Sequence, residues 1–105
     1  MVRGEIHRLT LPTGIGHEQR GERYGIVVQA DALLASSTVL IAPTSRSAAP
    51  ASFRPEVLVR GDAIRVLVEQ VGPADQQRIG QRVGHLVAEE MWSVDEALAT
   101  VLGLR

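Results

Sequence analysis

Hydrophobic residues in this chain form short runs that are separated by polar segments containing glycine and proline. β-Branched residues dominate the runs, which is typical of strands. The pattern predicts strands over residues 5–11, 25–30, 38–42, 56–60, 65–71 and 82–86. The Gly-rich segment 12–25 and the segment 44–52 have no apolar periodicity and are expected to be loops.

Turn-forming residues mark where several of these strands are expected to end. Pro43 should end the third strand, and Gly72 with Pro73 should end the fifth, because proline cannot donate a backbone hydrogen bond. Asp75 is expected to cap a short helical turn that follows.

One segment, residues 88–102, has the periodicity of an amphipathic helix. Apolar residues recur at intervals of three and four positions from Met91 to Leu102, and Gly103 is expected to end the helix. No Ser, Thr, Asp or Asn stands at the expected N-cap, so the pattern leaves the start of the helix open. Short strands followed by one helix cannot build a parallel βαβ sheet. The expected fold class is therefore mainly β (α+β), with the strands closed into a small antiparallel barrel.

Length and composition indicate one domain that covers residues 1–105. The chain has no cysteine, so neither a disulfide nor a thiolate metal site is expected. No apolar run reaches the roughly 18 residues that a membrane-spanning helix needs. Residues 1–5 do not resemble a secretory signal. We therefore expect a cytoplasmic protein that makes no contact with a membrane.

Charge alone does not indicate a nucleic-acid-binding protein, because the formal net charge is −1. All eleven basic residues are arginines, and the chain contains no lysine. A guanidinium group matches the geometry of a phosphate, but a GC-rich coding sequence produces the same bias. The positions of individual arginines, and not their number, therefore have to decide the question.

Two polar residues stand at the ends of the predicted buried strands. Arg23 comes just before the strand over 25–30, and Ser45 comes just after the strand over 38–42. If these strands pair in an antiparallel manner, Arg23 and Ser45 meet at one rim of the barrel. The alternative interpretation is that both are solvated loop residues. The three histidines lack metal-ligand spacing, and no serine has the strand–turn–helix context of a hydrolase nucleophile.

Short motifs in the order and spacing of a known family extend over nearly the whole chain. Residues 3–6 are similar to an opening R-G-[DE]-[IV], and residues 16–23 resemble the loop G-x-E-Q-x-G-x-R. Residues 39–45 resemble an apolar strand ending in P-x-[TS], residues 68–71 a [DE]-Q-[IV] segment, and residues 94–104 a terminal helix. On these motifs the chain resembles the MazF/PemK family of toxins from type II toxin–antitoxin systems.

The resemblance implies a small SH3-like barrel of the CcdB/MazF type that forms a homodimer. It implies an endoribonuclease that cuts single-stranded RNA at a short sequence, inhibits translation, and uses no metal or other cofactor. A cognate MazE-like antitoxin is expected to cover the RNA groove. The matched family positions imply that Arg23 and Ser45 are catalytic. They also imply an RNA-binding set that consists of Glu18, Gln19, Arg20, Thr44, Arg46 and Gln70.

Metal-free RNA cleavage needs groups that stabilise charge on a phosphate. The neighbouring 2′-hydroxyl attacks phosphorus, and negative charge builds on the non-bridging oxygens. The guanidinium of Arg23 can hold these oxygens through two charge-assisted hydrogen bonds, and the hydroxyl of Ser45 can donate another. His17 and Glu18 are the candidates for the general base, which stays unassigned.

The chain departs from the family pattern at three places. Tyr24 stands where proline usually follows the arginine, Gly72 and Pro73 replace a basic-plus-hydroxyl pair, and His7 stands where a large aromatic residue is common. These departures keep open a catalytically impaired barrel that binds RNA or protein. A gyrase inhibitor resembling CcdB is disfavoured, because the chain does not end in Trp-Gly-Ile.

Overall fold

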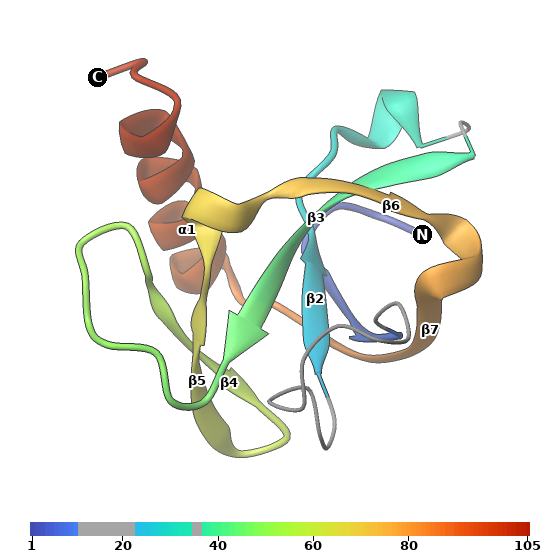
Figure 1. Cartoon of the computed structure of the whole chain (residues 1–105), viewed down its shortest axis with the longest axis horizontal. Coiled ribbons are helices and arrows are strands. Elements are labelled where there is room, and N and C mark those ends of the chain that lie inside the picture. The colour runs from blue at the N-terminus through green and yellow to red at the C-terminus, as the bar shows by residue number, and fades with distance from the viewer. Residues whose placement is uncertain (11–22, 35–36) are drawn as a thin grey trace.

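The computed structural model describes residues 1–10, 23–34 and 37–105. Within these residues the chain forms an antiparallel sheet and one C-terminal helix (Figure 1). The strands are β1 (Glu5–Leu9), β2 (Tyr24–Val27), β3 (Thr38–Ser45), β4 (Glu56–Val59), β5 (Asp62–Val66), β6 (Gly72–Asp75) and β7 (Ile79–His85). The other described elements are the helix α1 (Ala88–Val101) and the short 3-10 turns η2 (Asp31–Leu33), η3 (Val68–Gln70) and η4 (Gln76–Arg78).

The strands build one curled sheet. Its order is β4-β5-β3-β2-β1-β7, and β6 also pairs with β3. β3 has two partners along one edge, because its first half pairs with β6 and its last two residues pair with β5. The sheet therefore curls into a half-barrel, with α1 on the side of β5 and β7 on the opposite side (Figure 1). The fold class expected from the sequence is confirmed.

β2 is buried on both faces, which explains its unbroken apolar run. Tyr24 and Ile26 face a large core that includes Val94 of α1. Val27 points the other way, into a smaller cluster with Ile41 of β3. Because side chains alternate along a strand, these two clusters identify which face of the sheet each neighbouring residue lies on.

Pro43 lies inside β3, so the predicted end of this strand is wrong. Residues up to Ile41 pair with β6, and residues from Thr44 pair with β5. Pro43 thus occupies the step between two partner strands, where a missing N–H removes no ladder hydrogen bond. Its carbonyl oxygen accepts a hydrogen bond from the backbone N–H of Leu67 at 2.8 Å.

The predicted strand over 65–71 is also wrong, because the structure divides this segment. β5 begins earlier, at Asp62, and ends at Val66; η3 and then β6 follow. Gly72 and Pro73 begin β6 instead of ending a strand, because both pair with β3. Proline is tolerated there, since within the described part of the chain no second strand pairs with β6.

The chain around η4 agrees with the prediction in one respect and differs in another. Asp75 caps this turn as predicted, because its Oδ1 accepts a hydrogen bond from the backbone N–H of Gln77 at 2.9 Å. β7 begins at Ile79, directly after the turn and three residues before the predicted start at Arg82. Pairing with β1 continues to Ile79 across register shifts, which a strand pattern cannot anticipate.

The helix α1 agrees with the predicted segment, and a glutamate replaces the missing N-cap residue. Glu90 Oε1 accepts a hydrogen bond from the backbone N–H of Val87 at 2.9 Å. Its Oε2 accepts one from the N–H of Leu58 in β4 at 2.8 Å, so one carboxylate starts the helix and joins it to an edge strand. Gly103, with φ of 73°, ends the helix as predicted. No helix within the described ranges is long and apolar enough to cross a membrane.

Candidate functional site

Arg23 directly precedes β2, and Ser45 is the last residue of β3, the strand that pairs with β2. β2 and β3 are antiparallel, with Gly25 opposite Pro43. If this register is continued by two residues, Arg23 lies opposite Ser45. The antiparallel pairing on which the sequence-based expectation depended is therefore present, and both residues lie at the end of the sheet.

A groove of about 310 Å³ lies on the same face of the sheet. Ser45 shares its face of β3 with Pro43 and Ile41, because side chains alternate along the strand. By the same alternation Arg23 lies on the face of β2 that Val27 occupies, which packs with Ile41. The groove is lined by Leu9, Thr10, Ile41, Pro43, Gln70, Gly72, Pro73, Ala74, Asp75 and Arg78.

The hydroxyl of Ser45 is oriented by the chain that follows it. Its Oγ accepts a hydrogen bond from the backbone N–H of Ser47 at 3.2 Å. This local bond leaves the O–H of Ser45 to donate elsewhere. The arrangement suits a hydroxyl that donates to a bound anion.

Thr44 lies on the opposite face of β3 from Ser45. Its side chain is buried, and its Oγ1 donates a hydrogen bond to the backbone carbonyl of Tyr24 at 2.9 Å. This bond joins β2 to β3 directly beside the Arg23–Ser45 position. A role of Thr44 in RNA binding stays a prediction, and its observed contact is with the backbone of β2.

Gln70 lines the groove at the end of η3. Two contacts hold this turn against the sheet. Val68 is fully buried in the large core, and the N–H of Leu67 donates to the carbonyl of Pro43 in β3. The predicted RNA-binding residue Gln70 therefore lies beside Pro43, on the side of the groove that β3 forms.

An ion pair ties the turn η3 to the loop after β3. Arg54 donates from Nε and Nη2 to Oε2 of Glu69, at 2.9 and 2.7 Å. The hydrogen bond from Arg54 holds the pKa of the Glu69 carboxyl below its ordinary value. The [DE]-Q-[IV] motif contains Glu69, but nothing in the sequence pattern pointed to Arg54 as its partner.

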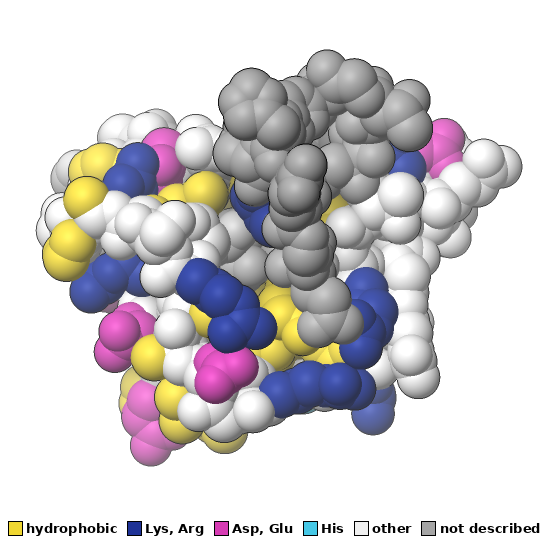
Figure 2. Space-filling view, turned by 60° about the horizontal axis from the view of Figure 1, so that its bottom comes forward, with side chains coloured by type: hydrophobic (Ala, Val, Ile, Leu, Met, Phe, Trp, Pro, Cys, Tyr) yellow, Lys and Arg dark blue, Asp and Glu magenta, His cyan; other side chains and the backbone are white. Residues whose placement is uncertain are grey.

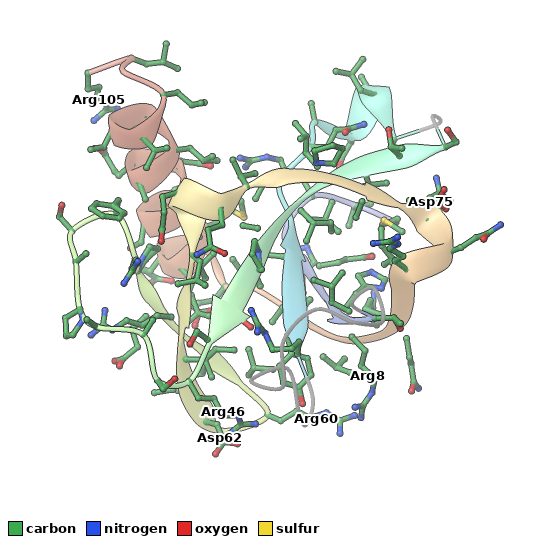
Figure 3. The ribbon with its side chains drawn as sticks, viewed as in Figure 1. Arg8, Arg46, Arg60, Asp62, Asp75 and Arg105 are labelled. Carbon is green, nitrogen blue, oxygen red and sulfur yellow. The ribbon has the colours of Figure 1, made fainter. Side chains whose placement is uncertain are left out.

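Arginines gather at the end of the sheet where Arg23 and Ser45 lie. Arg8, Arg46 and Arg60 lie along this end in Figure 3. Figure 2 shows the end face on, with arginine side chains around a hydrophobic patch. Arg46 Nη1 forms an ion pair with Oδ2 of Asp62 at 2.9 Å, and both side chains are more than half exposed.

Several predicted site residues cannot be placed in this arrangement. Glu18, Gln19 and Arg20, which were predicted to bind RNA, lie outside the described residues, as does His17. Their roles stay predictions from the sequence.

A second polar cluster joins β1 to β7. His7 Nε2 contacts Oε1 of Glu5 at 2.8 Å, and His7 Nδ1 contacts the carbonyl of Gly80 at 2.9 Å. Burial raises the pKa of Glu5, but the hydrogen bond from His7 outweighs it together with smaller contributions, so the pKa is lowered. His7, where an aromatic residue is common in the family, thus has a polar connecting role in this chain.

Comparison with known proteins identifies the family. A model of the PemK-like, MazF-like toxins of type II toxin–antitoxin systems matches residues 2–102. The chain belongs to this family. The toxin is 39% identical over 106 residues to the Mycobacterium tuberculosis protein Rv3098A, with 99% of each chain covered. It is 32% identical over 111 residues to the endoribonuclease EndoA of Bacillus subtilis, with 97% of this chain and 94% of the other covered.

Solved structures show that this MazF/PemK toxin has the MazF fold. An endoribonuclease in complex with its cognate antitoxin, from a mycobacterial species, superposes with a TM-score of 0.82 at 18% identity and covers 100% of this chain and 97% of its own. MazF from Deinococcus radiodurans gives a TM-score of 0.80 at 22% identity, with 98% and 96% covered. These likenesses confirm the barrel of the MazF type that the sequence implied.

Two departures of this toxin from the family pattern now have structural explanations. Tyr24, which replaces a proline, is buried in the large core, so burial rather than a fixed φ holds the residue after Arg23. Gly72 and Pro73, which replace a basic-plus-hydroxyl pair, line the groove as the start of β6. The groove is therefore more apolar at this position than the family pattern implies.

Proposed function

We propose that Arg23 and Ser45 are the catalytic pair of this MazF/PemK toxin, an endoribonuclease that cleaves single-stranded RNA without a metal ion. The observation that carries the proposal is the antiparallel β2–β3 register, which supports it because its continuation by two residues sets Arg23 opposite Ser45, on the face of the sheet that holds the groove. The family and the relative EndoA support the endoribonuclease activity.

In the proposed reaction the 2′-hydroxyl of the RNA gives its proton to a general base, for which His17 and Glu18 are the candidates, and its oxygen attacks the adjacent phosphorus. A bond forms between O2′ and phosphorus, and the bond from phosphorus to O5′ breaks. The products are a 2′,3′-cyclic phosphate and a 5′-hydroxyl, and the O5′ atom takes up a proton for which Arg23 is the candidate donor. Arg23 also stabilises charge on the non-bridging oxygens, and Ser45 donates a hydrogen bond to them.

The groove binds the RNA on either side of the reacting phosphate. Gln70 offers amide donors and acceptors to a base edge at the apolar part of the groove, and Arg46 offers a guanidinium to a phosphate. Glu18, Gln19 and Arg20 complete the proposed RNA-binding set. Thr44 contributes by holding β2 against β3, since its hydroxyl is engaged with Tyr24.

The partners follow from the family. We assign to this toxin a cognate MazE-like antitoxin that covers the RNA groove, as neighbours in the fold comparison were solved with their antitoxins. The toxin acts as a homodimer in the cytoplasm, and residues 1–105 form its single domain.

The test is cleavage of a long single-stranded RNA by the purified toxin in excess chelator, with the 5′ ends of the products mapped. Discrete cuts by the unmodified toxin are expected, with losses of at least about a hundredfold in Arg23→Ala. A smaller loss is expected in Ser45→Ala, because it removes one neutral donor. Arg105→Ala, which removes an arginine paired with Glu96 on α1, is the matched control.

Three outcomes would contradict the proposal. Cleavage that survives Arg23→Ala would remove Arg23 from the catalytic pair, and cleavage abolished by chelator would contradict a metal-free reaction. No cleavage at any ratio of toxin to RNA would favour a barrel that binds without cutting. In that case a gyrase supercoiling assay would test the remaining toxin activity.

A further inference from the structure

The turn between β4 and β5 has an unexpected residue at a demanding position. Val59 pairs with Asp62, so Arg60 and Gly61 form a two-residue hairpin loop. Their φ angles are 53° and 86°, which is the pattern of a type I′ turn. Asn-Gly is the favoured pair in this turn, because asparagine tolerates the left-handed region better than other side chains do. Arg60 is the only non-glycine residue with positive φ among the described residues.

The hairpin projects past the proposed catalytic pair. Ser45 pairs with Arg65 of β5. Asp62 lies three residues further along β5, which places the turn about 10 Å beyond the end of β3. The ion pair between Arg46 and Asp62 joins the residue after Ser45 to the base of the hairpin. The hairpin therefore extends the edge on which Arg23 and Ser45 lie.

The charge at this hairpin is positive. The side chain of Arg60 is exposed and has no carboxylate partner within the part of the chain that the structure describes. Arg46 pairs with Asp62 among the residues that the structure describes, and exposed pairs of this kind are weak. Arg8, Arg46 and Arg60 lie along this end in Figure 3, with Asp62 beside Arg46, although the net charge of the chain is −1.

We infer that Arg60 is a further RNA-binding residue, which contacts a backbone phosphate that flanks the scissile one. The inference rests on the proposed function, because an RNA strand that passes Arg23 and Ser45 and continues toward β5 meets the hairpin next. The short, closed turn fixes the direction in which the side chain of Arg60 leaves the backbone, and its guanidinium group matches the geometry of a phosphate. The inferred phosphate contact gives a function to the arginine that occupies this unfavourable backbone position.

The turn geometry allows a variant that removes the guanidinium group of Arg60, and with it RNA binding by this residue, without destabilising the fold. Arg60→Asn places the favoured residue in the type I′ turn, so Tm is expected to stay unchanged or to rise by about 2–4 °C. Affinity for RNA is expected to fall about fivefold at low salt. The slope of log K against log salt should become shallower by about 0.7, the value for one phosphate contact on a single strand. Arg105→Asn controls for the lost charge, because Arg105 follows α1 and lies far from this end in Figure 3.

Two probes distinguish this inference from the catalytic proposal. The first is single-stranded RNA, for which Arg60→Asn should raise KM with little change in kcat. The second is single-stranded DNA of the same sequence, which keeps the phosphates and lacks the attacking 2′-hydroxyl. Weaker DNA binding by Arg60→Asn supports the inference even if the unmodified toxin cuts no RNA.

An unchanged KM, DNA affinity and salt slope in Arg60→Asn would overturn the inference while leaving Arg23 and Ser45 untouched. Weaker binding of an acidic antitoxin peptide with unchanged binding of both nucleic acids would also overturn it, because Arg60 would then recognise protein. Equal losses in Arg105→Asn would show a general effect of net charge and would equally refute a local contact.

Discussion

Replacing Glu69 with glutamine should destabilise this toxin and loosen one wall of its groove. Arg54 donates two hydrogen bonds to Oε2 of Glu69, and each side chain is 25% exposed. The pair joins the loop after β3 to η3, the turn that carries Gln70 into the groove. Glu69→Gln keeps the shape of the side chain and removes the charge that Arg54 faces.

The magnitude follows from the burial of the pair. Hydrogen bonds to charged groups contribute about 1.5–3 kcal/mol when shielded, and exposed ion pairs contribute about 0–1 kcal/mol. Since a quarter of each side chain is exposed, we expect a coupling energy of about 1.5 kcal/mol between Arg54 and Glu69. In a domain of this size that loss lowers Tm by about 6–12 °C.

The assay is a double-mutant cycle measured by urea unfolding. Glu69→Gln, Arg54→Met and the double variant isolate the pairwise energy, because effects on each residue's other contacts cancel. The Arg46–Asp62 pair is a matched control, with a similar N–O distance but more than half of each side chain exposed. Its cycle, from Arg46→Met and Asp62→Asn, is expected to give no more than about 0.5 kcal/mol.

Equal coupling energies for the two pairs would refute the reasoning, because burial would then not decide their strength. The predicted effect of Glu69→Gln on function is measured separately, from the KM and kcat for RNA. Glu69→Gln should raise KM for RNA more than it lowers kcat, since the pair holds Gln70 and lies away from the reacting phosphate. A loss confined to kcat would show that Glu69 acts on the chemical step instead.

Three further results are expected from other contacts. The pKa values of Glu5 and Glu69 are lowered from the ordinary value of 4.5, so their ionised carboxylates stabilise the fold above pH 4.5. The free energy of unfolding should therefore decrease as the pH falls below 4.5, and it should decrease less steeply in Glu69→Gln. Measuring the unfolding free energy across an acid titration checks this. Gly25→Ala places a Cβ 2.5 Å from Cγ2 of Ile41 and should cost about 1–3 kcal/mol in urea unfolding; a neutral effect would contradict this packing. Glu90→Ala removes two backbone hydrogen bonds and should cost about 1–2 kcal/mol, with a helical signal that melts earlier on heating.

The sequence by itself determined the features that depend on neighbours along the chain. β-Branched runs predicted where most strands lie, since these side chains suit a pleated, half-buried backbone. The helical period and Gly103 predicted α1 and its end, because helix faces and αL ends are local properties. The family motifs also predicted Arg23 and Ser45 as a catalytic pair, without information on which strands lie side by side.

Only the tertiary structure decided what depends on distant partners. Pro43 could remain inside β3 because two different strands meet there, and Gly72 with Pro73 could begin β6 because β3 was available to pair with them. The sequence likewise did not determine which side chains of each strand lie on which face of the sheet. Register buried Thr44 and left Ser45 on the groove side, because a shift of one residue exchanges the two faces of a strand.

Long-range side-chain contacts were the least accessible to sequence reasoning. The bond of Glu90 to the N–H of Val87 is local, but its bond to the N–H of Leu58 exists only because β4 lies beside the start of α1. Arg54 and Arg60 carry no local signal, since one depends on a carboxylate fifteen residues away and the other on the end of the sheet at which its turn projects. Residues close in sequence determine local propensity. The residues of a site come together only when strands that are distant in sequence pair and close the loops between them.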